Sequence, residues 1–269
     1  MYKRQEHEHP ELVEQISTCK SPMQIFSAVI KEHFKQVQEV DGKETVVFAI
    51  MPCTAKKDEQ VRPEFIYEDG SRDTDGVITT QEFASILKQA GIVFEDVEPE
   101  AADMPFGITS GAGVIFGVTG GVAEAVIRRV VDDKSNNMLH NIAYTGVRGM
   151  EGIKEASIPY GEGRVKIAVV NGLANAEKLI EQIEIGEAEY DFVEVMACPG
   201  GCIAGAGQPF TRMEGKKERA KGLYDADKLS QVKRSEENPV MMALYGGILK
   251  NKTHELLHVD YNKREEVAK

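Results

Sequence analysis

Two cysteines separated by three residues are the most reactive feature of this sequence. Cys198 and Cys202 enclose Pro-Gly-Gly, and the apolar run Phe192–Ala197 before them predicts a buried strand. Pro199 cannot donate a ladder hydrogen bond, and glycines adopt backbone conformations that a strand excludes. We therefore expect a tight loop that presents two thiols. The spacing differs from the Cys-x2-Cys of zinc ribbons and thioredoxin-like sites, and it suits a loop around something bulkier; the alternative is a glycine-rich turn with incidental cysteines.

A third cysteine, Cys53, follows a second apolar strand, predicted over Thr45–Ile50. It also lies just past the end of its strand and next to a proline, Pro52. Thiolates hold iron–sulfur clusters, and open α/β sheets bind their ligands beyond the carboxyl ends of the strands. The two cysteine segments therefore favour metal or redox chemistry at the ends of strands.

The two segments resemble signature motifs of a known family. MPCTAKKDE at 51–59 and EVMACPGGCIAGAGQP at 194–209 are similar to two motifs of the catalytic domain of iron-only (FeFe) hydrogenases. SGAGVIFGVTGGVAEAVIR at 110–128 and STCKSPMQIF at 17–26 resemble the same family, so the resemblance covers nearly the whole chain. It implies a two-lobed fold with the cofactor between the lobes.

The resemblance implies a specific cofactor. Cys53, Cys198 and Cys202 match three ligands of a 4Fe–4S cluster, and Cys202 matches the residue that bridges it to a diiron subcluster with CO, CN and dithiolate ligands. This compound centre, the H-cluster, reversibly reduces protons to dihydrogen. Ferredoxin or another electron carrier is the partner that the family implies, and anaerobic life is expected from the cofactor.

Several residues around the cysteines match positions near the H-cluster. Lys56 matches a lysine that donates to a cyanide ligand, whereas a solvated surface lysine, like its neighbour Lys57, is the alternative. Met51 and Met196 match methionines that line the diiron site, although either one alone suits ordinary core packing.

The other residues that match family positions are indicated by weaker sequence patterns. Phe116 and Gly117 match residues near the open iron position, with a core role as the alternative, and Gly201 is predicted to bind the cofactor. Ser17 matches a serine of the family's proton path, but a lone hydroxyl is usually a turn or cap residue. Cys19 matches no ligand position and is predicted to be inert.

The sequence also departs from the family. The motif TSCCPxW, expected upstream of STCKSP, supplies the fourth cluster ligand and does not occur. We therefore expect an incomplete first lobe with an exposed apolar strand, an inactive isolated chain, and a missing N-terminal segment or subunit that supplies the fourth cysteine. Ala206 replaces a family glycine, which is tolerable unless that position needs a positive φ. The alternative function is a non-catalytic iron–sulfur protein with a sensor or assembly role.

Two carboxylates flank the cysteine motifs. We expect Glu59 and Glu194 to anchor their loops by accepting backbone hydrogen bonds or pairing with lysine, without transferring protons. The glycine run Gly111–Gly121 could suggest a nucleotide loop, but its spacing misses GxGxxG and no clean strand precedes it. A glycine-rich wall against a compact cofactor is the favoured interpretation.

The elements that position these residues alternate between strand and helix, which predicts an α/β fold of twisted, mostly parallel sheets flanked by helices. Further strands are predicted at Val77-Ile78 and Val165–Asn171, and helices at Met23–Gln38, Thr80–Ala90, Val122–Val131 and Ala174–Ile185. Residues 1–211 are interpreted as the large-subunit catalytic domain. Residues 212–269, which are charged, helical and end near HELLHVDY, are interpreted as a small-subunit-like segment packed on it.

Composition excludes some partners. The net charge of −12 disfavours nucleic acid and anionic membranes, and no apolar run approaches the roughly 20 residues of a membrane span. Four cysteines are too few for a secreted disulfide scaffold. The sequence therefore predicts a cytoplasmic protein in a reducing compartment.

Overall fold

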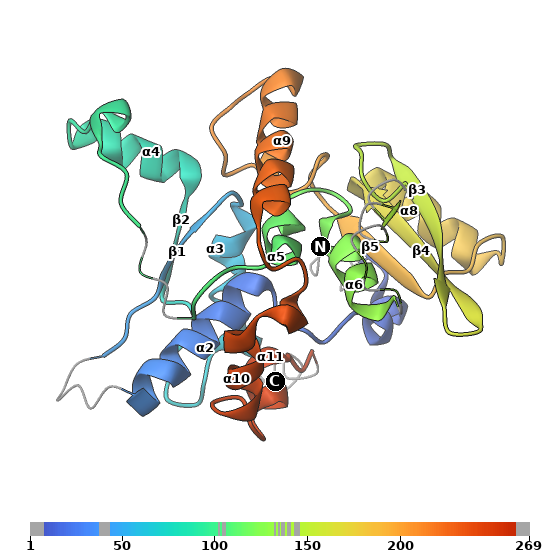
Figure 1. The fold of residues 1–269 in the computed structure, drawn as a ribbon, viewed down its shortest axis with the longest axis horizontal. Helices are drawn as coiled ribbons and strands as arrows, with labels where there is room; N and C mark the ends of the chain where they lie inside the picture. Colours follow the sequence, from blue (N-terminus) through green and yellow to red (C-terminus); the bar gives the residue numbers. More distant parts are fainter. Residues whose placement is uncertain are drawn as a thin grey trace. The chain divides into compact units, whose positions relative to one another are not determined.

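The computed structural model describes residues 8–37 and 44–261, apart from 102, 104, 105, 132, 134, 136, 137, 139, 140 and 143–145. The chain divides into two compact units. The first unit contains Met1–Val97 and Ala243–Lys269, and the second contains Glu98–Met242 (Figure 1). Among the described residues, no helix combines the length and apolarity needed to cross a bilayer.

The first unit contains a small parallel sheet. Strand β1 (Phe48–Met51) pairs with β2 (Gly76–Thr79) in a register that places Met51 opposite Thr79. The helices of this unit are α2 (Pro22–Val37), α3 (Ala55–Glu59), α4 (Thr80–Gln89) and α11 (Thr253–Leu257), with 3-10 turns η1 (Pro10–Gln15), η2 (Pro63–Phe65) and η3 (Phe94–Asp96). Helix α10 (Pro239–Gly246) spans the boundary between the units.

Helix α4 begins at Thr80, the predicted first residue, and Thr79 caps it. The hydroxyl of Thr79 accepts from the backbone N–H of Glu82, and the Glu82 carboxylate accepts from the backbone N–H of Thr79. This reciprocal capping box satisfies two donors that a helix start leaves unpaired. The predicted start of this helix is therefore confirmed.

Strand β1 exposes apolar side chains. Phe48 and Ile50 are 67% and 47% exposed, and they alternate with half-buried neighbours, as period-2 side chains do. The predicted exposed apolar surface is confirmed for this strand. The strand itself begins at Phe48, three residues later than the Thr45 that its apolar pattern suggested.

The second unit is built on a three-stranded sheet, β3 (Ile153–Tyr160), β4 (Gly163–Asn171) and β5 (Phe192–Met196). Central strand β4 pairs antiparallel with β3 and parallel with β5. Ile167 and Val169 pack with Ala123 and Ile127 of α6 (Gly121–Val130), while the alternate residues Ala168 and Val170 pack with Ala176 and Leu179 of α8 (Leu173–Glu184) (Figure 1). Helices therefore cover both faces of β4, which explains its continuous apolar run.

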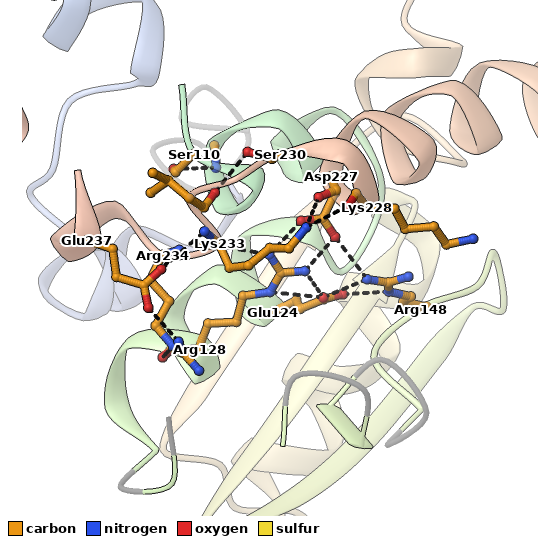
Figure 2. A network of polar contacts seen from close by, with 12 residues as sticks. Ser110, Glu124, Arg128, Arg148, Asp227, Lys228, Ser230, Lys233, Arg234 and Glu237 are labelled. Carbon is orange, nitrogen blue, oxygen red and sulfur yellow. Dashed lines mark hydrogen bonds and ion pairs between the residues drawn. The ribbon is translucent and has the colours of Figure 1, made fainter. Parts of the chain in front are cut away.

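A buried network of charges fastens the long helix α9 (Met213–Leu229) inside the second unit. Figure 2 shows Arg128 of α6 between two carboxylates: its guanidinium donates to both oxygens of Asp227, at 2.8 and 2.7 Å, and to Glu124. Arg148 donates to both oxygens of Glu124, at 2.7 Å each. Burial opposes ionisation of Asp227, yet Arg128 holds the pKa of this carboxyl below its usual range. The network therefore keeps its charges by pairing them.

Two sequence expectations need correction in this unit. Strand β3 was not predicted, and its hairpin with β4 makes one pair of the sheet antiparallel. Strand β5 is not uniformly buried, since among its five residues only Glu194 is fully buried. The glycine-rich stretch contains a short helix α5 (Gly111–Val114) and a 3-10 turn η4 (Ile115–Gly117). The remaining predicted helices and strands are present with shifted ends.

Candidate functional site

The predicted cysteine loop follows β5 directly. Cys198 is half-buried, Cys202 is exposed, and no disulfide joins any of the four cysteines. Gly200 and Gly201 have φ values of 99° and 83°, in the left-handed region that side chains other than glycine rarely adopt. The N–H of Gly201 donates to the carbonyl of Cys198 at 2.9 Å and closes the turn. The glycines therefore fold the chain back between the two thiols, as predicted.

The cysteine loop lies against the glycine-rich segment. A Cβ atom on Gly201 would lie 2.7 Å from the Thr119 nitrogen and 2.9 Å from the Val118 carbonyl carbon. Since real Cβ atoms do not approach backbone this closely, only glycine fits at position 201. The contact joins the cysteine loop to residues 117–119. The favoured interpretation of this segment as a glycine-rich wall is consistent with this backbone approach.

Glu194 lies on β5, the strand that leads into the cysteine loop, and it bonds this strand to the start of α6. Its carboxylate is 5% exposed and accepts the N–H groups of Gly120 and Ala123, at 2.6 and 2.7 Å, where α6 begins. Burial raises the pKa of Glu194, and the two N–H groups oppose that shift. The predicted anchoring carboxylate is confirmed. Lys154 of β3, which no sequence pattern singled out, is also buried there, and burial lowers the pKa of its ammonium.

The remaining matched residues of the second unit lie on the same elements. Met196 ends β5, and its carbonyl accepts from Gly172 at 2.8 Å. Phe116 and Gly117 lie in η4 and are half-buried. A Cβ atom on Gly117 would lie 2.8 Å from a methyl group of Leu223 in α9, and the leucine side chain would have to shift to admit it.

In the first unit, Cys53 is half-buried and lies between β1 and α3. Met51 is the last residue of β1 and is also half-buried. The backbone before and after Cys53 is thus a strand end and a helix start, the setting that the sequence predicted.

Lys56 and Lys57 differ in exposure and in their ion-pair partners. The Lys56 side chain is 19% exposed and pairs with the carboxylate of Glu59, which also accepts from the hydroxyl of Ser21. The Lys57 side chain is 39% exposed and pairs with Glu82. Glu59 is buried, so its predicted role as a lysine-pairing anchor is confirmed. The position of the Lys56 ammonium is therefore fixed by a buried counter-charge.

Ser17 and Cys19 are exposed neighbours in a turn. The Ser17 hydroxyl accepts from the Cys19 N–H at 3.3 Å, and the Ser17 carbonyl accepts from the Tyr261 hydroxyl at 2.9 Å. These hydrogen bonds agree with the alternative interpretation of Ser17 as a turn residue. Cys19 forms a backbone bridge with His258, whose ring nitrogen lies 2.8 Å from the Thr18 hydroxyl.

Each unit by itself offers thiols of the kind that iron–sulfur clusters bind. Cys53 is a free thiol just after β1 in the first unit, and Cys198 and Cys202 are free thiols in the loop after β5 in the second unit. Glycine at position 201, beside Cys202, lets the loop pack directly against the backbone of residues 117–119. Asn251 is the only described non-glycine residue with a left-handed φ, so Ala206 adopts an ordinary backbone and its replacement of glycine is tolerable.

The family of the chain follows from comparison with known proteins. Residues 1–206 match the family described as "Iron only hydrogenase large subunit, C-terminal domain", and residues 213–264 match "Iron hydrogenase small subunit". The chain belongs to the iron-only hydrogenase family. Its mixed α/β architecture with parallel strand pairs agrees with the fold of solved FeFe hydrogenases.

Individual relatives include hydrogenases and an assembly factor. Iron hydrogenase 1 of Clostridium pasteurianum is 40% identical over 268 residues, which cover 96% of this chain and 46% of the relative. The cytosolic Fe-S cluster assembly factor narfl of Xenopus tropicalis is 30% identical over 261 residues, which cover 94% of this chain and 55% of that protein. The chain therefore spans about half the length of these curated relatives.

The fold is shared with a solved hydrogenase. A variant of the apo FeFe hydrogenase HydA1 from Chlamydomonas reinhardtii superposes with a TM-score of 0.76 at 36% sequence identity. The match covers 96% of this chain and 73% of that one. Membership in the iron-only hydrogenase family is thus supported by both sequence and fold.

Proposed function

We propose that this chain is the catalytic-domain portion of an FeFe hydrogenase, an enzyme that reversibly reduces protons to dihydrogen at an H-cluster, and that the chain does not catalyse this reaction by itself. The observation that carries the proposal is the loop of Cys198 and Cys202, two reduced thiols on a glycine backbone at the carboxyl end of a strand in a member of this family. Cys53 is proposed as the third thiolate, and Cys202 as the one shared with the diiron subcluster. The organometallic group, when bound, supplies the proton-reduction chemistry.

The chain's own residues hold and orient that group. Three thiolates ligate the cubane, and one of its irons takes a ligand from outside this set. Lys56 donates from a fixed position to an anionic ligand, because its pairing with buried Glu59 restricts the ammonium. Met51 and Met196 contribute adaptable walls at the two strand ends. Phe116 and Gly117 are proposed to shape the cavity, and Ser17 to pass protons.

Cluster binding is tested by anaerobic reconstitution of the chain with iron and sulfide. We expect about four irons per chain and an electron paramagnetic resonance signal after reduction. Cys53→Ser, Cys198→Ser and Cys202→Ser should each lose most of this iron. Cys19→Ser, the matched control on an exposed turn, should retain it. A Cys202→Ser chain with a full, reducible cluster would contradict the ligand assignment.

The second candidate is a non-catalytic iron–sulfur protein, which the similarity to a cluster assembly factor favours. A cubane-only protein has no chemical use for a lysine aimed at an anionic ligand. Addition of a synthetic diiron complex to the reconstituted chain, followed by infrared spectroscopy, separates the two candidates. Carbonyl and cyanide bands that shift in Lys56→Ala, but not in Lys57→Ala, support the hydrogenase. A reducible cubane without such bands supports the alternative.

An electron carrier such as ferredoxin is the proposed partner. The segment 212–221 carries five basic and two acidic residues, although the whole chain has a net charge of −12. This local excess is suited to an acidic carrier. Lys217→Glu should slow electron transfer from reduced ferredoxin at low salt, and Lys250→Glu, an equally exposed control, should not. Equal rates in both variants would contradict docking at this segment.

Two further assignments remain proposals. Residues 1–211 are proposed as the large-subunit-like domain, and 212–269 as a small-subunit-like segment packed on it. The cytoplasm is the proposed location, and it can be checked by fractionation of cells that express the protein.

A further inference from the structure

A buried asparagine outside every matched motif joins the cysteine loop to its surroundings. Asn171 is the last residue of β4, is 6% exposed, and lies opposite Met196 in the sheet register. We infer that Asn171 is a positioning residue that holds the loop of Cys198 and Cys202 in the conformation that a cluster requires. The inference rests on the proposed function, because it concerns how the chain receives that cluster.

The hydrogen bonds of the loop show why it needs this residue. Pro199 has no N–H, and the N–H of Gly201 is used inside the loop by the Cys198 carbonyl. The N–H of Gly200 instead reaches outside the loop and donates to Oδ1 of Asn171 at 2.8 Å. The side chain of Asn171 therefore fixes the middle of the loop, at a glycine with a left-handed φ of 99°.

The other contacts of Asn171 fix its own orientation. Its Nδ2 donates to the carbonyl of Met150 at 2.7 Å, and its Oδ1 also accepts from the hydroxyl of Thr119 at 3.3 Å. A flipped amide would set its NH2 against the N–H of Gly200 and its oxygen against the carbonyl of Met150, so the orientation is determined by these two partners. One buried amide thus connects three segments: the cysteine loop, the glycine-rich wall and the segment before β3.

This arrangement matters for a metal group because ligands that are already ordered bind without reorganisation. Residues that orient the ligands of a metal typically contribute about 10-fold to 100-fold to its retention. Asn171 acts through the backbone of Gly200 and touches neither thiol in the contacts described above. Its effect should therefore appear in the order of the loop and in iron retention, before any effect on catalysis.

The test compares Asn171→Leu and Asn171→Asp with Asn175→Ala in the full chain. Leucine has the size of asparagine but no polar atoms, and aspartate keeps the acceptor for Gly200 while it loses the donor to Met150. Asn175 is the matched control, because its amide donates only to the Asn171 backbone carbonyl, at 2.7 Å, in the contacts found here. Two readouts are measured: amide hydrogen exchange of residues 198–202 without metal, and release of iron from the reconstituted cluster to a chelator.

We expect exchange in the loop and iron release to be about tenfold faster in Asn171→Leu, intermediate in Asn171→Asp, and within about twofold of wild type in Asn175→Ala. Unchanged exchange or unchanged iron release in Asn171→Leu would overturn the inference, and so would an equal change in Asn175→Ala. If the leucine variant does not fold, the same criteria apply to Asn171→Asp. A wild-type chain that takes up no cubane contradicts the proposed function itself, and the inference fails with it.

Discussion

The two cysteine-bearing regions of this protein are held by different kinds of contact. In the second unit, side chains on β4 and β5 bond to groups far away in the sequence, since Asn171 lies 29 residues from Gly200 of the cysteine loop and Glu194 lies 74 residues from Gly120 at the start of α6. In the first unit, the ammonium of Lys56 is paired within one helical turn, with Glu59. The cysteine loop of the second unit is thus held by contacts distant in sequence, whereas the ammonium of Lys56 is paired locally, with a carboxylate that also accepts from Ser21.

The strands that lead into the two regions also differ, in how deeply their side chains are buried. Residues Ile167–Val170 of β4 are at most 1% exposed and are covered on both faces, whereas Phe48 and Ile50 of β1 are exposed. A loop at the end of a covered strand inherits its rigidity from packing. We therefore expect substitutions in the second unit to have the larger effects on stability.

The largest effect should come from the buried network of α6 and α9. Arg128→Met leaves Glu124 and Asp227 buried with less counter-charge, which should lower the free energy of unfolding by about 4 kcal/mol. Arg129→Met is the matched control, because the Arg129 side chain is 68% exposed and should cost about 0.5 kcal/mol or less. Urea unfolding followed by circular dichroism measures both values. Similar losses in the two variants would refute the stabilising role of the network.

A smaller but still large effect is expected at the glycine contact. Gly201→Ala places a side chain at φ 83° and ψ −161°, a region used almost only by glycine, and drives its Cβ against the backbone of residues 118–119. The combined strain and overlap should lower the free energy of unfolding by about 3 kcal/mol and displace the cysteine loop.

Gly186→Ala is the control for conformation alone. Gly186 also has a positive φ, 76°, but a Cβ atom there would meet nothing within 4 Å. Gly186→Ala should lower the free energy of unfolding by about 1 kcal/mol. Thermal unfolding of both variants gives the difference, and equal losses would mean that the contact with the glycine-rich wall contributes nothing.

The sequence was informative wherever a signal is local. Apolar periodicity located β4, β5 and their helices, and the start of α4 was predicted at Thr80, where the structure has it. Strand β3 was missed because it carries a buried charged residue, Lys154, whose ammonium donates to the carbonyls of Val147 and Gly149 in the segment just before the strand. A residue pattern does not show that this segment turns back onto the ammonium.

The same limit applies to the site. The cysteine motifs could be read because their glycines and prolines act on their own backbone. The role of Asn171 could not be predicted, because its three partners lie 21, 29 and 52 residues away in the sequence. A polar residue followed by glycine at the end of an apolar strand was the available signal, and it is common in loops that have no site.

In the first unit, loss of the ion pair of Lys56 should have an effect of intermediate size. Glu59→Gln keeps an acceptor for Ser21 but removes the charge opposite Lys56, and the side chain of Glu59 is only 9% exposed. The free energy of unfolding should fall by about 1.5 kcal/mol. Lys57→Met, which breaks the more exposed pair with Glu82, should cost about 0.5 kcal/mol. Chemical denaturation tests both, and a larger loss in Lys57→Met would reverse the assignment of the two lysines.

The smallest effect is a pH dependence confined to the start of α4. Hydrogen bonds from Lys57 and then from Thr79 lower the pKa of Glu82 to about 2. Because the folded pKa lies below the ordinary value of 4.5, the capping box contributes fully above about pH 4.5 and is lost as the pH falls through about 2. Amide exchange in the first turn of α4 should therefore accelerate over this range, beyond the intrinsic pH dependence of exchange. It should not do so in α8, whose first turn carries no acidic residue. Glu82→Gln should abolish the dependence, since glutamine caps without titrating. A Glu82 that titrates near 4.5 by nuclear magnetic resonance would show that the box is not formed in solution, and the contrast between local and long-range stabilisation would lose its clearest local example.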